Sequence, residues 1–401
     1  MGGLRESDAL LHFAPKADTD AAAAPEKAAA VGRKVRDTMD GEARGNPGLD
    51  PAVGRAPRAQ GRRGRRSNDG NGADRGGATY AALDLGTNNC RLLVARPTED
   101  GFRVVDAFSR IIRLGEGLSA SGRLSDAAAA RAVEALAVCR DKMKNKGVTR
   151  ARLIATEACR SADNGGDFCA RIARDVGLEL EIVDRETEAC LAATGCTPLV
   201  DPQADGVLLF DIGGGSSELV RLDRLQDSGY GPPPPRIRGW VSLPHGVVTL
   251  AERYGGEHVT RDVYEAMVAE VASLIVPFAA QHGSGIDNMH LLGTSGTVTT
   301  IAGVHLELRR YDRSRVDGCW MTADEISGVI DRLLTMDYRQ RSESPCIGPE
   351  RADLVLAGCA ILDAIRRAFP LSRLRVADRG LREGMLVQMM RDDGVWVGVA
   401  S

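Results

Sequence analysis

The sequence predicts an α/β protein built from two duplicated domains that face each other across a cleft. Short apolar runs alternate with helical patterns along most of the chain, which is typical of strands alternating with helices. The chain also contains an internal repeat, because Asp84 aligns with Asp211 without a gap and a Gly-rich turn and an apolar run follow in both copies. Two copies of strand, acidic residue, turn and strand imply two like domains, and two such hairpins facing each other would form a cleft.

Composition divides the 401-residue chain near Gly77. Residues 1–77 hold 14 Lys and Arg, 11 Asp and Glu, no Cys or Trp, and Phe13 as the only aromatic residue. Such a segment cannot bury enough apolar surface to offset its conformational entropy, so we predict a disordered basic tail over residues 1–77. An Arg cluster at 62–66 within it fits a solvated linker better than a contact with RNA or an acidic partner.

Residues 78–401 carry 38 Lys and Arg and 44 Asp and Glu, a net charge of −6. This charge argues against a protein that coats nucleic acid, although an anionic substrate needs only a local positive site. No window holds the roughly 18 uninterrupted apolar residues of a spanning helix, and the chain does not start like a signal peptide, so we expect a soluble, cytoplasmic protein with no membrane partner. The nine Cys form no CxxC pair and are expected to be reduced core residues. Whether the protein forms a homodimer is left open.

The first domain is predicted to span residues 78–196. We expect strands at 80–85, 90–95, 151–156 and 180–183, a helix capped by Ser125, a helix around 168–176 that ends at Gly177, and a helix from near Arg185.

The second domain is predicted to span residues 197–380. Strands are expected at 207–212, 217–222 and 289–292, and helices at 260–281, 322–336 and 350–368. A Pro-rich run at 231–235 is expected to form an exposed loop, because proline fits neither a helix nor a central strand. A last helix at 381–391, within the segment 381–395, is expected to complete the first domain.

Three turns rich in Gly, Thr, Asn and Ser follow predicted strands, at 86–89, 213–217 and 293–297. Such turns expose backbone N–H groups with little side chain in the way, so they can wrap phosphate oxygens. A single turn of this kind is more often an ordinary hairpin. Three of them, two with an Asp at the same place, make phosphate binding the better hypothesis.

The two aspartates of the repeat, with Glu218 on the return strand of the second copy, suggest a metal site. Phosphate-rich substrates normally arrive with Mg²⁺, a hard cation held by one or two carboxylates, water and the phosphates themselves. Asp84, Asp211 and Glu218 could supply those carboxylates, so Mg²⁺ is the cofactor we expect. The alternative is that these acids only hydrogen-bond the turns, as Asp often does.

Longer motifs extend the turns. The first reads Ala-Ala-Leu-Asp-Leu-Gly-Thr-Asn-Asn-Cys-Arg at 81–91 and the second Phe-Asp-Ile-Gly-Gly-Gly-Ser-Ser-Glu-Leu at 210–219, and further motifs lie at 155–164, 186–191, 292–297, 350–353 and 380–384. In this order they resemble the exopolyphosphatase and guanosine pentaphosphate phosphatase (Ppx/GppA) family over residues 78–391. That family belongs to the superfamily of actin-like ATPases, sugar kinases and heat-shock chaperones, so the resemblance implies two actin-like domains.

The resemblance implies a hydrolase that releases terminal phosphate from inorganic polyphosphate or guanosine pentaphosphate. Glu188 matches the family's general base, which orients a water molecule and takes its proton as the water attacks in line. Taken alone, a Glu early in a helix is more often a surface residue that compensates the helix dipole. Arg91 and Arg351 match substrate-binding arginines, and Arg160 with Asn164 lies in a motif expected to face the same cleft. The full substrate-binding set is Gly86, Thr87, Asn88, Arg91, Arg160, Asn164, Gly213, Gly214, Gly215, Ser216, Ser217, Gly293, Ser295, Gly296 and Arg351.

The sequence departs from the family pattern in two ways. Thr87 and Asn89 stand where the family more often has serines, and both keep a hydrogen-bonding side chain. Longer relatives append a helical region, whereas this sequence resembles a short two-domain form, which favours short chains or guanosine pentaphosphate over very long polyphosphate.

Two other functions stay open. One is an ATP-dependent kinase of the same superfamily, with the turn at 293–297 lining an adenosine pocket, and the other is a non-catalytic nucleotide-sensing module. A kinase would need a base for an acceptor hydroxyl, and a sensor could dispense with Glu188, which this sequence keeps.

Overall fold

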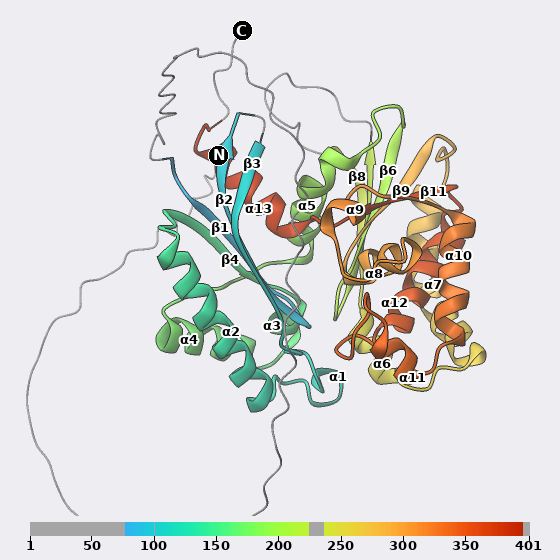
Figure 1. Cartoon of the computed structure of the whole chain (residues 1–401), viewed down its shortest axis with the longest axis horizontal. Helices are drawn as coiled ribbons and strands as arrows, with labels where there is room; N and C mark the ends of the chain where they lie inside the picture. The colour runs from blue at the N-terminus through green and yellow to red at the C-terminus, as the bar shows by residue number, and fades with distance from the viewer. Residues whose placement is uncertain (1–76, 100, 224–235, 396–401) are drawn as a thin grey trace, which may run out of the picture. The chain divides into compact units, whose positions relative to one another are not determined.

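The computed structural model describes residues 77–99, 101–223 and 236–395. The basic tail predicted over residues 1–77 lies outside the described residues except for its last position, and so does the loop predicted at 231–235. The described part contains two mixed β-sheets with helices packed against them (Figure 1).

The first sheet has five strands in the order β3-β2-β1-β4-β5, with β1 antiparallel to β2 and parallel to β4. Its strands are β1 (Tyr80–Leu85), β2 (Asn89–Thr98), β3 (Gly101–Ile111), β4 (Arg150–Ala155) and β5 (Glu181–Ile182). Successive side chains of β1 point to opposite faces, and both faces are covered. Leu83 packs in a cluster with α2 (Asp126–Asn145) and α4 (Gly165–Val176), whereas Tyr80 packs with α13 (Leu381–Asp392).

Two predicted helix ends of this domain are confirmed. Ser125 caps α2, because its side chain accepts a hydrogen bond from the N–H of Ala128. Helix α4 ends at Gly177, which adopts φ 74°, a conformation that glycine takes at little cost. The remaining elements of this part of the chain are α1 (Leu118–Ser121), α3 (Glu157–Ser161), α5 (Arg185–Cys196) and the 3₁₀ turn η1 (Thr197–Leu199).

The second sheet has six strands in the order β10-β11-β9-β6-β7-β8. Its strands are β6 (Gly206–Ile212), β7 (Ser217–Asp223), β8 (Arg236–Leu243), β9 (Met289–Thr294), β10 (Trp320–Thr322) and β11 (Arg373–Ala377). The helices of this part are α6 (Val247–Tyr254), α7 (Arg261–His282), α8 (Gly296–His305), α9 (Arg313–Val316), α10 (Ala323–Thr335), α11 (Tyr338–Glu343) and α12 (Val355–Ala368).

The two sheets follow one plan. The strands β1, β2, β3, β4 and β5 correspond in order and position to β6, β7, β8, β9 and β11, and β10 is an addition at the edge of the second sheet. Asp84 pairs with Arg91 across β1 and β2, and Asp211 pairs with Glu218 across β6 and β7 at the same register. The repeat in the sequence is therefore a repeat of the fold, and the predicted class, α/β with two duplicated domains, is confirmed.

Helix α13, near the end of the chain, packs against the first sheet. Leu381, Met385 and Leu386 share a buried cluster with Tyr80 of β1. The helix also lies directly against α5, since a Cβ added at Gly195 would lie 1.9 Å from the Gly380 oxygen. The exact domain boundaries at 196 and 380 stay predictions.

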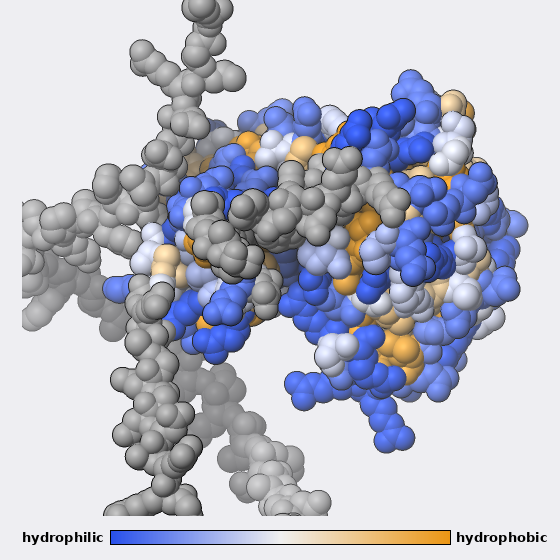
Figure 2. All heavy atoms as spheres, turned by 90° about the horizontal axis from the view of Figure 1, so that it is seen from above, coloured by the Kyte–Doolittle hydropathy of each residue, from blue (hydrophilic) through white to orange (hydrophobic). Residues whose placement is uncertain are grey.

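By length and mean hydropathy alone, helix α7 could cross a membrane. Its apolar residues are nevertheless interrupted by charged ones such as Glu270. Its buried side chains, among them Met267, Val271 and Ile275, belong to the core cluster that also contains α12. On the face drawn in Figure 2, hydrophilic side chains predominate and hydrophobic ones form only scattered patches. Packing in the domain core accounts for the buried face of α7.

The structure departs from the prediction in several places. The strands β3, β8, β10 and β11 were not predicted, and the side chains of β3 are at most half-buried, so it carries no clean apolar alternation. The helix predicted from residue 350 is wrong in its first turn, because α12 begins only at Val355. A Cβ added at Gly256 would lie 1.9 Å from the Asp353 oxygen, so tertiary packing against this stretch overrides its helical pattern.

Candidate active site

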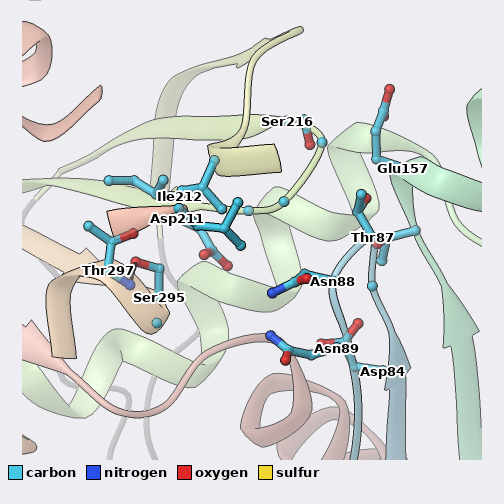
Figure 3. A pocket seen from close by; sticks show the side chains of 18 of the residues that line it. Asp84, Thr87, Asn88, Asn89, Glu157, Asp211, Ile212, Ser216, Ser295 and Thr297 are labelled. Carbon is cyan, nitrogen blue, oxygen red and sulfur yellow. Dashed lines mark hydrogen bonds between the residues drawn. The ribbon is translucent and has the colours of Figure 1, made fainter. Parts of the chain in front are cut away.

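The three Gly-rich turns meet at one pocket (Figure 3). In Figure 3 the labelled side chains of the β1–β2 turn approach it from one side, and those of β6 and the start of α8 from the other. The predicted site residues that line it are Asp84, Gly86, Thr87, Asn88, Arg91, Glu188, Asp211, Gly213, Gly214, Gly215, Ser216, Ser295, Gly296 and Arg351. Residues from both sheets therefore contribute to a single site.

The first two turns have the same backbone geometry. The N–H of Gly86 donates to the Asn89 oxygen, and the N–H of Gly213 donates to the Ser216 oxygen, both at 2.9 Å. This hydrogen bond closes each turn between its two strands. The duplication thus extends to the turns themselves.

Each turn is held from outside through its carbonyl groups. Asn88 O accepts the N–H of Ile112 at 2.8 Å, and Gly214 O accepts the N–H of Val248, at the start of α6, at 2.8 Å. In a trans peptide the C=O of one residue and the N–H of the next point in opposite directions. The N–H groups that follow these carbonyls therefore point away from the supporting segments, as anion binding by a turn requires.

Glycine is required where α6 meets the second turn. A Cβ added at Gly246 would lie 2.3 Å from the Gly214 carbonyl carbon and 2.5 Å from the Gly213 oxygen. A Cβ at Gly214 would lie 2.9 Å from the Thr87 Cβ, so the first two turns also touch each other. Gly246 was not predicted as part of the site, because it is remote in sequence from all three turns.

The third turn has a strained residue at its centre. Ser295 adopts φ 148°, which is unusual for a residue other than glycine, and its side chain caps α8 by accepting the N–H groups of Thr297 and Val298. The N-terminal turn of α8, whose peptide dipoles favour negative charge, thereby borders the pocket. The sequence predicted Ser295 and Gly296 here, and the structure adds Thr297 and Thr300.

Two arginines bring positive charge to the pocket. Arg91 lies across from Asp84 in the β1–β2 ladder, and within the described ranges it forms no ion pair of 4.0 Å or less. Arg351 donates a long hydrogen bond of 3.4 Å to Thr300 Oγ1. Burial, and then the charge of Arg91, lower the pKa of Arg351. A guanidinium whose charge is disfavoured by burial and by a second guanidinium favours an anion beside it.

Four acids whose pKa is raised gather around the same pocket. Burial raises the pKa of Asp211 to about 7, and the charges of Glu188 and Asp84 add to the effect. Burial also raises the pKa of Asp84, although Arg91 opposes it. Glu218, 3% exposed, has its pKa raised to about 7 by burial and then by Asp211.

Glu188 is an acid of the pocket wall whose pKa is also raised. It lies in the first turn of α5, which Asp184 caps by accepting the N–H of Thr187 at 2.7 Å. Burial and the charge of Glu218 raise the pKa of Glu188 to about 8, whereas Arg160 acts to lower it. A carboxylate whose pKa lies near neutral pH suits a general base.

The acids fit a divalent cation only if other ligands complete its shell. Within 77–99, 101–223 and 236–395, no group of three or more His, Cys, Asp or Glu is placed to hold a metal ion. Mg²⁺ commonly takes one or two carboxylates and fills the remaining positions with water and phosphate oxygens. The charges of Glu188 and Asp84 help to raise the pKa of Asp211, so a cation beside Asp84 and Asp211 would offset negative charge there. The donor set therefore fits Mg²⁺.

Some predicted site residues lie elsewhere. Asn164 is outside the pocket, since its amide donates to Leu124 O at 3.0 Å and accepts from Leu124 N at 2.8 Å. Ser217 donates to the His245 oxygen at 2.7 Å. A Cβ at Gly293 would lie 2.5 Å from the Phe210 ring, so that glycine serves packing. These three residues stabilise the structure around the pocket and do not line its wall.

Glu218 and Arg160 are also absent from the pocket wall, but both touch residues that form it. Glu218 Oε1 accepts hydrogen bonds from Ser216 Oγ at 2.7 Å and Ser242 Oγ at 2.9 Å. Arg160 pairs with Glu188 at 3.1 Å. The structure thus places Glu218 and Arg160 behind the pocket residues.

Several wall residues were not predicted. Asn89, Thr156, Glu157, Thr297 and Thr300 add polar groups, and the apolar part of the wall comes from Ile212, Val247, Leu354, Val355 and Leu381. The Oδ1 atoms of Asn88 and Asn89 are buried without a hydrogen-bond partner in the described part of the chain. The quoted motifs contained Asn89 and Glu157, so their positions were readable although their roles were not assigned.

A duplicated α/β fold whose Gly-rich turns, arginines and buried acids converge on one pocket defines an enzyme that handles phosphate groups. The chain belongs to the Ppx/GppA phosphatase family, whose model matches residues 93–393, and it is therefore a phosphatase. The family resemblance inferred from the motifs is confirmed.

Solved structures agree with this assignment. The chain is similar to the Ppx/GppA family member of Aquifex aeolicus, with 27% identity and a TM-score of 0.65 over 79% of this chain and 98% of that one. It is also similar to an exopolyphosphatase-like protein, with 29% identity and a TM-score of 0.71 over 79% of this chain and 98% of that one. An exopolyphosphatase from Cytophaga hutchinsonii shares the fold, with 22% identity and a TM-score of 0.71 over 78% of this chain and 98% of that one.

Proposed function

We propose that the protein hydrolyses phosphoanhydride bonds and releases terminal phosphate from inorganic polyphosphate or guanosine pentaphosphate, with Glu188 as general base. The observation that carries the proposal is the position of Glu188, an acid 14% exposed, at a wall formed by three Gly-rich turns and two arginines. Family membership supports the reaction class, and the chemistry of the pocket supports the choice of base.

Charge complementarity supports a phosphate chain as the substrate. Arg91 and Arg351 can offset the charge that spreads over the phosphate oxygens in the transition state, and turn N–H groups and the start of α8 can hold the remaining oxygens. These groups concentrate positive potential in one pocket of a chain whose net charge is −3. A local site is all that a polyanion requires.

The residues present would hold Mg²⁺ through Asp84 and Asp211, with water and substrate oxygens completing the shell. When bound, the ion would neutralise charge on the phosphates. Glu188 itself has one task, which is to accept the proton of a water molecule aligned with the terminal phosphorus. Its raised pKa makes it a competent base once the pH exceeds about 8.

The test compares both substrates side by side with one pair of variants. Wild-type protein with Mg²⁺ is expected to release inorganic phosphate from at least one of polyphosphate and guanosine pentaphosphate. Glu188→Gln should lose about 10³-fold or more in kcat while it still binds substrate, because Gln cannot take a proton. Glu186→Gln, an exposed neighbour in the same helix turn, is the matched control and should keep full activity. Undiminished turnover in Glu188→Gln would remove Glu188 as the base.

A further inference from the structure

Arg160 was expected to bind substrate phosphate, but its guanidinium is already engaged. The side chain is 16% exposed. Nε and Nη2 donate to Glu157 Oε2 at 3.1 and 2.6 Å, Nη1 donates to Val183 O at 2.6 Å, and Nη2 also donates to Glu188 Oε2 at 3.1 Å. A guanidinium has about five N–H donors, so roughly one is left. A bidentate grip on phosphate needs two parallel donors and is therefore not available.

Glu157 fixes Arg160 in this position. Its Oε1 accepts hydrogen bonds from Ser161 Oγ at 2.5 Å and Arg185 Nη2 at 2.9 Å, and its Oε2 faces Arg160. Burial acts to raise the pKa of Glu157, but the hydrogen bonds from Ser161 and Arg160 outweigh it, so the pKa lies below its ordinary value. In Figure 3 the Glu157 side chain points away from the labelled acids. Glu157 is an anion committed to two arginines.

Arg160 contacts Glu188 at one carboxylate oxygen. Oε2 of Glu188 accepts from Arg160, whereas in the described part of the chain no hydrogen-bond donor is placed on Oε1. Glu188 also forms part of the pocket wall. A carboxylate held through one oxygen keeps the other for a water molecule, and the adjacent guanidinium favours the ionised form that a base requires.

We propose that Arg160 is a positioning residue: held by Glu157, it fixes the Glu188 carboxylate so that the second oxygen faces the attacking water. Arg160 acts on the reaction only through Glu188 and makes no contact with substrate. This inference rests on the proposed function, since it requires Glu188 to be the base.

The first experiment separates kcat from KM. Arg160→Met should lower kcat by about tenfold or more and change KM by less than about threefold, because the base is misaligned while the phosphate site is intact. Arg160→Lys, which keeps the charge with fewer donors, should recover part of the loss, and Glu157→Gln should lower kcat by a smaller factor. Arg171→Met, which removes an ion pair with Asp175 on α4, is the control and should leave both constants unchanged.

The second experiment repeats Arg160→Met in the Glu188→Gln background. Residual turnover should not fall further, and the Kd for polyphosphate should stay within about threefold, because a residue that acts through Glu188 has no effect once Glu188 is gone. A tenfold rise in KM or Kd would make Arg160 a substrate-binding residue and overturn the inference. Equal losses in both backgrounds, with a lowered Tm, would make it structural and overturn the inference as well.

Failure of the inference is distinguishable from failure of the proposed function. Wild-type protein that releases phosphate while Arg160→Met and Glu157→Gln keep full kcat contradicts the positioning role alone. Wild-type protein that releases no phosphate from either substrate contradicts the proposed function, and the positioning role with it.

Discussion

Replacing Glu188 by Gln should stabilise the protein at neutral pH. The folded-state pKa of Glu188 is about 8, against an ordinary value of 4.5, so the native state holds a proton that the unfolded state releases between these two pH values. Because the native state binds more protons in that window, the free energy of unfolding falls as the pH rises through it. Gln is neutral in both states and carries no such cost.

The magnitude follows from the two pKa values. Each pH unit above 4.5 costs about 1.4 kcal/mol until the pH approaches 8, so Glu188→Gln should raise the free energy of unfolding by about 3 kcal/mol at pH 7. At pH 4.5 and below, the gain should be close to zero, because Glu188 is then protonated in both states. Gln can still accept the hydrogen bond from Arg160, so the packing of the native state is retained.

Urea unfolding at pH 5, 7 and 8, followed by circular dichroism, measures this difference. Glu186→Gln, which changes an exposed Glu of the same helix, should stay within about 0.5 kcal/mol of wild type at every pH. A Glu188→Gln variant that is less stable than wild type at pH 7, or a difference that does not change between pH 5 and 8, would refute the account of Glu188 as a largely desolvated acid with a raised pKa.

Three further predictions follow from the site. Because the base acts when ionised, kcat/KM should rise as the pH rises through about 8. A phosphate-release assay over pH 6 to 9.5 measures this rise, and a profile flat over that range would contradict the role of Glu188. Gly246→Ala should lower kcat/KM by about tenfold or more, since its Cβ would displace the second turn. Gly166→Ala, at a helical position with open space around it, is the control and should keep kcat/KM. Equal effects of the two substitutions would refute the packing argument. Arg351→Met should raise KM by about tenfold, and an unchanged KM would show that this arginine does not hold substrate.

The fold was predictable because short local motifs in the sequence reveal its duplication. Each copy has an acid at the same place before a Gly-rich turn and an apolar run, so Asp84 and Asp211 with the residues that follow them reveal the repeat. The strand β3 gave no signal because its side chains are at most half-buried. The start of α12 was misplaced because close contact with Gly256 outweighs local helical preference.

The candidate site was predictable where it follows the turns and not where it depends on packing between distant segments. Gly246 contacts the second turn from a loop whose amino-acid composition does not suggest phosphate binding. Arg160 lies in a recognised motif, yet its partners come from α3 and α5, and only their juxtaposition shows that it faces Glu188 rather than the pocket. Periodicity within one segment cannot report such pairings.

The most direct test of the central claim is hydrolysis in water enriched in oxygen-18. If the water oriented by Glu188 attacks the terminal phosphorus, the released orthophosphate carries one labelled oxygen, the shortened chain carries none, and Glu188→Gln yields neither product at the wild-type rate. Label in the shortened chain, or phosphate that passes to an added hydroxyl compound without label, would contradict the claim.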